Sequence, residues 1–427
     1  MCGLAGIWSD NILKIDEIKI SLNKMSKSIK HRGPDSKGIW VDGPSGLGFA
    51  HQRLSIIDLS DAGHQPMVSN SGRYVLAFNG EIYNHMDLRY SIRKKNIGYP
   101  WRGSSDTETL LASIELFGLQ KTLDLCTGMF AFALWDKYEK ILFLVRDRFG
   151  EKPLYFGNFI NKNHSDSNEI CSSFFFASEI SAIKAVLDSN LEINTKALEG
   201  FLDFGYVPSN MSIYNGITQL PPGFLLRIKS SKSGFCPSSI LKPRKWWNFE
   251  RTDQPNMNED KNNETNILRN LENKLIKSVV QQSVADVKLA SFLSGGIDSS
   301  LITTLLSNNL SRKVNSFTIT FPDDNDTFNE GPIASQTAKI LNTNHTEVPI
   351  TERDVQLLIP DLNSIYSEPF ADSSQVPTHL ICREASKSGI KVALTGDGGD
   401  ELFGGYNRHL MIPLILKYTS YLPYKLR

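Results

Sequence analysis

Hydrophobic and polar residues follow a strand-like rhythm along the first half of this chain. Short runs of aliphatic and aromatic residues, bounded by turn residues, predict strands at Leu4–Trp8, Gly46–His51, Arg73–Phe78, Met129–Asp136 and Ile141–Arg146. Apolar residues at helical spacing predict helices over Ile15–Ile29 and Thr107–Phe117, the second with Asp106 as its N-cap. Many strands with few helices indicate a layered α+β domain, which we place at residues 1–205.

The rhythm changes at about residue 266, where strands and helices begin to alternate. After a helix through Ile267–Val279, the pattern predicts strands at Val287–Leu293, Val314–Thr320, His345–Val348 and Ile390–Thr395, and helices at Ser299–Ser307, Pro332–Leu341 and Val376–Ser386. Such alternation favours a parallel sheet covered by helices, with ligands at the carboxyl ends of its strands. We therefore expect an α/β domain at 266–427 and a connecting segment at 206–265, in which Thr252–Thr265 forms a solvated loop.

Composition narrows the function classes. Lys+Arg and Asp+Glu both number 46, so the chain lacks the basic excess of a general nucleic-acid binder. Its five cysteines have no paired spacing, which argues against a zinc site or a disulfide framework. The sequence shows no secretory signal and no apolar run long enough to span a bilayer. We expect a cytoplasmic protein without nucleic-acid or membrane partners.

The first candidate for chemistry is Cys2, directly after Met1. Trimming of the initiator methionine would leave the thiol beside its own α-amino group, whose ordinary pKa is about 7.7–8.0. That amine can serve as a base for the neighbouring sulfur near neutral pH. The alternative is that Cys2 is an inert, buried cysteine.

Three polar clusters follow, at residues 31–35, 51–58 and 78–84. Each could be ordinary turn chemistry, and Asn-Gly at 79–80 is a hairpin-turn signal. Functionally, the Asn79 amide and the Gly80 N–H could stabilise the oxyanion of an acyl-transfer intermediate. Arg53 could hold a carboxylate, and Glu81 with Asp106 could receive an α-ammonium group. An arginine and two acids are what a free amino acid needs.

The order of these motifs resembles class II glutamine amidotransferases. The resemblance rests on Cys2-Gly3, His31–Asp35, His51–Asp58, Phe78–Asn84, Ser104–Glu108, Arg146–Tyr155 and Phe176–Glu179. Most similar is the glutamine-dependent asparagine synthetase family. The resemblance implies an N-terminal nucleophile (Ntn) glutaminase fold for the first domain, with Cys2 as the nucleophile. It also implies glutamine-holding roles for Arg53, Glu81 and Asp106, and oxyanion and glutamine contacts for Asn79 and Gly80.

A second candidate site lies between the first strand and helix of the α/β domain. Gly295 and Gly296 would let backbone amides form an anion nest, and Ser294, Ser299 and Ser300 add hydroxyl donors at a helix N-terminus. Asp298 could help to hold Mg²⁺. The alternative is a plain strand–turn–helix connection. No lysine closes the loop as in GxxxxGK[ST], and the motif instead resembles the pyrophosphate loop of ATP pyrophosphatases.

The same resemblance assigns further residues of the second domain, which it implies to be adenine-nucleotide α-hydrolase-like. Leu293 and Ile319 would flank the adenine, and Thr395 and Gly396 would contact the adenylate. Acidic positions near the acceptor and the metal are Asp397, Asp400 and Glu401, so Mg²⁺ would be held by Asp298 and Asp400. A calcium loop is the alternative for Leu394–Tyr406, although the spacing is not that of an EF-hand.

These assignments imply ATP-dependent amidation of aspartate to asparagine, with ammonia from glutamine, through a β-aspartyl-adenylate and with release of AMP and pyrophosphate. The alternatives are an amidotransferase for another carboxylate, such as a sugar acid, and a glutaminase-only or non-catalytic subunit. Synthetases of this family continue into a helical C-terminal part. We therefore expect the synthetase domain to be incomplete at its C-terminus, and a homodimer or a chain that supplies the missing part as partner.

Overall fold

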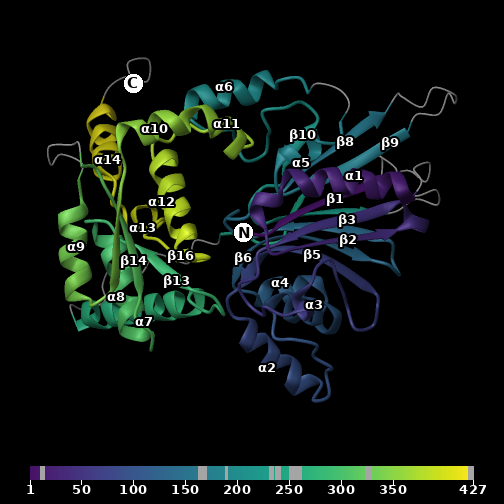
Figure 1. The fold of residues 1–427 in the computed structure, drawn as a ribbon, viewed down its shortest axis with the longest axis horizontal. Coiled ribbons are helices and arrows are strands. Elements are labelled where there is room, and N and C mark those ends of the chain that lie inside the picture. The colour runs from purple at the N-terminus through teal and green to yellow at the C-terminus, as the bar shows by residue number, and fades with distance from the viewer. Residues whose placement is uncertain are drawn as a thin grey trace. The chain divides into compact units, whose positions relative to one another are not determined.

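The computed structural model describes residues 1–9, 15–161, 171–187, 191–229, 235, 242–249, 262–322 and 329–421. The chain forms two compact units (Figure 1). Unit 1 comprises Met1–Pro255 and Asp361–Asp372, and unit 2 comprises Asn256–Pro360 and Ser373–Arg427.

Unit 1 contains two antiparallel sheets in its described part. The first has the order β10-β8-β9-β1-β3-β2, with bounds Ile217–Gln219, Tyr155–Asn161, Cys171–Ala177, Gly3–Ser9, Leu47–Arg53 and Ser36–Asp42. The second has the order β12-β11-β7-β6-β5-β4, with bounds Arg244–Lys245, Phe224–Lys229, Ile141–Arg146, Gly128–Asp136, Tyr74–Ile82 and Met67–Val68. Its helices are α1 (Ile15–Ser28), α2 (His85–Lys95), α3 (Asp106–Phe117), α4 (Leu119–Leu125), α5 (Ile180–Lys184), α6 (Thr195–Phe204) and α11 (Leu362–Ile365).

The two sheets of unit 1 pack face to face over an apolar core. Trp8 of β1 meets Trp135 of β6 edge-on, with ring centroids 5.2 Å apart. Successive residues of a strand point to opposite faces, so Ile7 of β1 packs outward against Leu22 of α1. On the outer face of the second sheet, Leu110 and other apolar residues of α3 pack against β5 and β6. The result is the layered α+β domain that the sequence predicts.

Local signals in unit 1 are partly overridden. The five predicted strands are present, but β5 continues from Tyr74 to Ile82, so Asn79 and Gly80 lie inside a strand and the hairpin-turn alternative is wrong. The N-cap of α3 is Ser105, whose side chain accepts from the Glu108 N–H. Asp106 is the first helical residue instead of the predicted cap, and its carboxylate is thereby free to face β5.

Unit 2 is built on the predicted parallel sheet, with the order β15-β14-β13-β16 and bounds Asn344–Pro349, Asn315–Thr320, Leu289–Phe292 and Val392–Leu394. Its helices are α7 (Asn262–Gln282), α8 (Ile297–Asn309), α9 (Gly331–Ile340), α10 (Glu352–Leu358), α12 (Gln375–Lys387), α13 (Gly399–Phe403) and α14 (Asn407–Thr419). The expected loop at Thr252–Thr265 is wrong over 262–265, where α7 has already begun, and residues 252–261 lie outside the described ones.

One segment of unit 1 comes from far along the chain. Residues 361–372, which we call the strap, lie in sequence between two stretches of unit 2. The Glu368 carboxylate accepts from the Ile213 N–H at 2.8 Å and from the Tyr155 hydroxyl at 2.9 Å. Ala371 N–H donates to the Gly205 carbonyl at 2.9 Å. The predicted boundaries at 205 and 265 stay predictions, since the strap makes unit 1 discontinuous.

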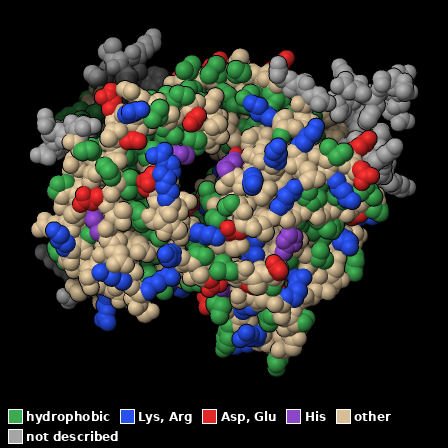
Figure 2. Space-filling view, viewed as in Figure 1, with side chains coloured by type: hydrophobic (Ala, Val, Ile, Leu, Met, Phe, Trp, Pro, Cys, Tyr) green, Lys and Arg blue, Asp and Glu red, His purple; other side chains and the backbone are tan. Residues whose placement is uncertain are grey.

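The surface agrees with the charge balance of the sequence. On the face shown in Figure 2, Lys and Arg side chains are interspersed with Asp and Glu, as the balanced totals of 46 and 46 suggest. No helix in the described ranges is long and apolar enough to cross a membrane.

Candidate functional site

The thiol of Cys2 lies at the start of β1, beside the end of β3. Its sulfur is 3.3 Å from the Leu54 N–H, which donates to it. Burial raises the pKa of the Cys2 thiol, and this N–H donor opposes the rise because it favours the thiolate. The backbone here is anchored from the 31–35 cluster: Arg32 Nε donates to the Cys2 carbonyl at 3.0 Å, and Arg32 Nη1 pairs with Glu179 at 2.7 Å.

Six residues that the sequence singled out converge on one cavity of unit 1, of about 50 Å³. They are Cys2, Arg53, Asn79, Gly80, Glu81 and Asp106. Other residues also line it, among them Met1, Gln65, Thr107 and Lys152, to which the sequence analysis assigned no role. A volume of about 50 Å³ holds one or two waters. Because Met1 occupies part of the wall and blocks the Cys2 amine in a peptide bond, its removal would both enlarge the cavity and create the base.

The oxyanion candidates lie side by side on β5. Both polar atoms of the Asn79 amide are buried and have no hydrogen-bond partner in the described part of the chain. A Cβ at Gly80 would lie 2.6 Å from Phe130 Cα, so only glycine fits against β6 at this point. A buried amide without a partner costs about 1–3 kcal/mol. An unpaired buried amide at a cavity wall therefore indicates that Asn79 is retained for function despite its cost in stability.

Glu81 and Asp106 form an acidic wall of the cavity. Asp106 Oδ2 accepts from the Ile82 N–H at 2.9 Å, and burial raises the pKa of its carboxyl. Burial, reinforced by the charge of Asp106, raises the pKa of Glu81 to about 8. Lys152, nearby, opposes this rise. Two buried acids with raised pKa values favour a cationic ligand, because a cation would stabilise both ionised forms.

The raised pKa of Glu81 leads to a prediction for Glu81→Gln. Between pH 4.5 and about pH 8 the unfolded chain releases the Glu81 proton while the folded chain retains it, so stability is lost as pH rises through this window. Replacing Glu81 by Gln removes the loss, and we expect the variant to be more stable at pH 8 by about 2–4 kcal/mol, with no gain at pH 4. Denaturant titrations at both pH values measure this. An equal gain at both would contradict the assignment.

Arg53 is held by main-chain carbonyls on the loop after β3. Its Nη1 donates to the Ser60 carbonyl at 2.9 Å and its Nη2 to the Asp58 carbonyl. Because a guanidinium has five N–H donors, these two bonds orient the group and leave donors for a ligand in the cavity that Arg53 lines.

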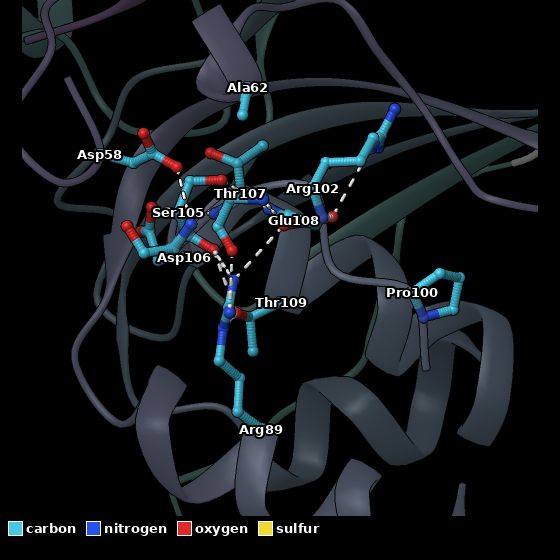
Figure 3. A network of polar contacts seen from close by, with 12 residues as sticks. Asp58, Ala62, Arg89, Pro100, Arg102, Ser105, Asp106, Thr107, Glu108 and Thr109 are labelled. Carbon is cyan, nitrogen blue, oxygen red and sulfur yellow. Dashed lines mark hydrogen bonds and ion pairs between the residues drawn. The ribbon is translucent and has the colours of Figure 1, made fainter. Parts of the chain in front are cut away.

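A buried network fixes the start of α3 (Figure 3). Arg89 of α2 donates to the Ser105 carbonyl at 3.1 Å and to Thr109 Oγ1 at 2.7 Å, and it pairs with Glu108 at 3.5 Å. Glu108 in turn accepts from the Arg102 N–H at 2.8 Å. Ordered in this way, the first turn of α3 holds Asp106 at the cavity.

The 146–155 motif builds the loop that carries Lys152. Asp147 is fully buried, and its carboxylate accepts the N–H groups of Phe149, Gly150, Glu151 and Lys152 at 2.6–3.0 Å. Arg146 Nε closes the loop by donating to the Lys152 carbonyl at 2.8 Å. Lys152 is buried, which lowers its pKa. The sequence motif contained this residue, but only the fold shows that it lines the same cavity as Glu81.

In unit 2, the structure brings together the two predicted loops. Ser294 Oγ and Ser299 Oγ are 2.8 Å apart across the 294–299 loop. A Cβ at Gly396 would lie 2.8 Å from the Ser299 N, so the 395–401 loop packs directly on the start of α8. Gly295 N–H donates to Glu330 Oε2 at 3.1 Å, so a carboxylate of this chain already occupies this amide.

The remaining predicted residues of unit 2 differ in burial: Leu293 is buried, and the others are half-buried or exposed. Leu293 is buried against Ala334 and Ala338 of α9, so its side chain lies in the core. Asp298 lies against Gly399, where a Cβ would be 2.5 Å from its carboxyl carbon. Half-buried or exposed residues at or beyond the strand ends are Ile319, Thr395, Asp397, Asp400 and Glu401. Glu401 accepts from the Tyr406 hydroxyl at 2.8 Å, which lowers its pKa.

Two further observations bound the site of unit 2. Within the described ranges, no three or more His, Cys, Asp or Glu side chains are grouped so that they could hold a metal ion. A separate cavity of about 320 Å³ is lined by β15, α10 and α12, and it contains none of the predicted residues.

Comparison with known proteins matches both units. Residues 1–238 match the family model of the glutamine amidotransferase domain, and residues 270–426 match that of asparagine synthase. The chain is 32% identical over 425 residues to glutamine-hydrolysing asparagine synthetase 1 of Bacillus subtilis, which covers 99% of this chain and 61% of that protein. It is 33% identical to putative asparagine synthetase 2 of Methanocaldococcus jannaschii, covering 96% and 76%. It is 34% identical to a putative asparagine synthetase of Mycobacterium tuberculosis, covering 95% and 60%. The chain thus spans about three fifths to three quarters of the length of these relatives.

Proposed function

The chain belongs to the glutamine-hydrolysing asparagine synthase family, and from this premise we propose that it hydrolyses glutamine in unit 1 and uses the ammonia in unit 2 to amidate a carboxylate, aspartate in the first place. The observation that carries the proposal is the convergence of Cys2, the Asn79–Gly80 pair and the Glu81–Asp106 pair on one cavity.

The residues of unit 1 divide the work of hydrolysis. Arg53 binds the α-carboxylate of glutamine, and Glu81 with Asp106 receives its α-ammonium group. The Cys2 thiolate attacks the side-chain amide carbon, and Asn79 and the Gly80 N–H stabilise the resulting oxyanion. Ammonia leaves with the proton that the α-amine took from the thiol, and water then releases glutamate from the thioester.

In unit 2 the loop residues fit a nucleotide with its metal. The Gly295 amide donates to the carboxylate of Glu330. The contact of Gly396 with Ser299 leaves no space for a side chain at position 396. Asp298 and Asp400 would hold Mg²⁺, for which carboxylate oxygens are suitable ligands. Bound ATP supplies activation of the acceptor carboxylate, with pyrophosphate as a product. Ser294 and Ser299 hold the loop in shape. A phosphate would have to replace the side chains of Ser299, Glu330 and Ser294, to which the amides of residues 294, 295 and 296 donate.

The proposal predicts a specific effect of Gly396→Ala. Because the new Cβ would lie 2.8 Å from Ser299 N, the 395–401 loop must move away from the start of α8. We expect ATP affinity to fall roughly tenfold or more, the loss of about one charge-assisted hydrogen bond. Isothermal titration with Mg-ATP measures it. Gly98→Ala, where a Cβ meets no described residue within 4 Å, is the matched control. Equal affinities of both variants would exclude these loops as the nucleotide site.

The whole proposal is tested by incubating the chain with glutamine, Mg-ATP and aspartate and following glutamate and pyrophosphate together. Formation of both, with pyrophosphate dependent on aspartate, supports the proposed reaction. Pyrophosphate that requires another acid, such as a sugar acid, would change the acceptor. Glutamate without pyrophosphate under any acid would limit the chain to glutaminase activity.

A further inference from the structure

One edge of β5 is only partly covered by a neighbouring strand. β6 pairs with β5 along its whole length, from Tyr74 to Ile82. On the other side, within the described part of unit 1, β4 pairs with β5 only at Val75 and Leu76. Backbone groups on one edge of a strand recur at every second residue. The uncovered edge therefore presents the N–H and C=O groups of Phe78, Gly80 and Ile82.

Side chains from elsewhere take the place of the absent strand. Gln65 Oε1 accepts from the Phe78 N–H at 2.7 Å, and Asp106 Oδ2 accepts from the Ile82 N–H at 2.9 Å. His51 Nε2 lies 2.9 Å from the Phe78 carbonyl, and since a carbonyl only accepts, this nitrogen donates. Gln65 and His51 are both buried.

Gly80 lies between these two occupied positions, with its N–H on the same edge. Opposite it on β6, Phe130 exchanges its N–H and C=O with Asp147 instead of β5. The Gly80 N–H is therefore not used by β6 and faces the cavity that Gly80 lines. The side chain of Asn79, on the adjoining residue, has no hydrogen bond of its own to hold it within the described structure. The direction of both oxyanion donors depends on how firmly β5 is held at Phe78.

Gln65 also connects β5 to the acidic wall. Its amide nitrogen donates to Thr107 Oγ1 at 3.3 Å, one residue after Asp106. A single side chain thus joins the strand of the oxyanion donors to the helix that carries a carboxylate for the ammonium group. We propose that Gln65 is a positioning residue for glutamine hydrolysis, which replaces a strand at Phe78 and sets the spacing between the two ends of the amino-acid site. This inference rests on the glutaminase activity proposed above.

The test compares Gln65→Met with Gln52→Met. Methionine matches the length of glutamine and makes neither hydrogen bond of Gln65. Gln52 is equally buried and donates to Ser26 of α1 at 2.8 and 3.0 Å, but it does not line the cavity. We expect Gln65→Met to lower kcat for glutamine roughly tenfold to a hundredfold, as a small misplacement of catalytic groups does, with a much smaller change in KM. Gln52→Met should keep the wild-type kcat.

Alkylation of Cys2 by iodoacetamide distinguishes a misplaced β5 from a collapsed site. A collapsed site would change the alkylation rate, whereas a misplaced β5 would not. The thiolate displaces iodide without forming an oxyanion, so its rate depends on the nucleophile and not on β5. In Gln65→Met, mass spectrometry of the Cys2 peptide should show a near-wild-type alkylation rate.

The outcomes are separable. A kcat loss no larger than that of Gln52→Met, or a parallel loss of alkylation, would overturn the positioning role. Should Gln65→Met not fold, Thr107→Val removes only the far hydrogen bond, and an unchanged kcat there would also count against it. A wild-type chain that does not hydrolyse glutamine would instead overturn the proposed function itself.

Discussion

Replacing Cys2 by alanine is expected to lower glutamine hydrolysis by a factor on the order of 10⁴ or more, the scale on which loss of a covalent nucleophile acts. The structure supports this size because, among the described residues, no second cysteine lines the cavity. The sulfur of Cys2 also accepts a hydrogen bond from the Leu54 N–H. Release of glutamate from glutamine, measured at saturating substrate, gives the number.

Two comparisons make the Cys2→Ala result specific. Cys382→Ala removes an exposed free cysteine of α12 in unit 2 and should leave glutamine hydrolysis unchanged. If unit 2 makes product from added ammonia, that activity should persist in Cys2→Ala, since the nucleophile acts only on glutamine. Equal loss of glutamine-dependent and ammonia-dependent product would be inconsistent with the assignment.

Replacing Asn79 by leucine is expected to lower kcat for glutamine about 10²–10³-fold, as removal of one oxyanion donor does in acyl transfer. KM should change little, because the donor acts on charge that develops only in the transition state. The same variant should be more stable than the wild type, by about 1–3 kcal/mol, because leucine removes a buried amide that has no partner in the described structure.

The opposite signs of these two effects are informative. A residue with a structural role alone would lose stability on substitution and lose activity only as a result. Asn158→Leu is the matched control, since Asn158 on β8 also has a buried amide oxygen without a partner among the described residues and lies outside the cavity. We expect that control to be as active as the wild type. Lower stability of Asn79→Leu in chemical denaturation would remove the argument that the amide is retained for function.

Much of this site could be predicted from sequence because its chemistry is carried by short, local clusters. The residue types at 2, 53, 79–81 and 106 indicate an amino-acid site with a nucleophile, and the fold brings all of them to one cavity. The parallel sheet of unit 2 was also predictable, because strand–helix alternation leaves few other arrangements.

Features that depend on pairing between distant strands were not predictable. The Asn-Gly dipeptide at 79–80 is a local turn signal, but continuous pairing with β6 overrides it. Periodicity tells which face of a strand is buried and says nothing of which edge is uncovered. For that reason Gln65, in a loop before β4, gave no functional signal, although it accepts a hydrogen bond from the Phe78 N–H of β5. Lys152 was missed for a similar reason, since a loop closed by Asp147 turns it inward.

The strap has a consequence for dividing this protein into separate pieces. The two family models match residues 1–238 and 270–426, which suggests that each half could be expressed from its own gene. Yet the first compact unit includes residues 361–372, and the Tyr155 hydroxyl and the Ile213 N–H both donate to Glu368. A fragment ending at Pro255 would leave these two donors without their carboxylate. A gene split between the two family models would therefore separate parts of one compact unit, and we expect the first half to be less stable alone than within the whole chain.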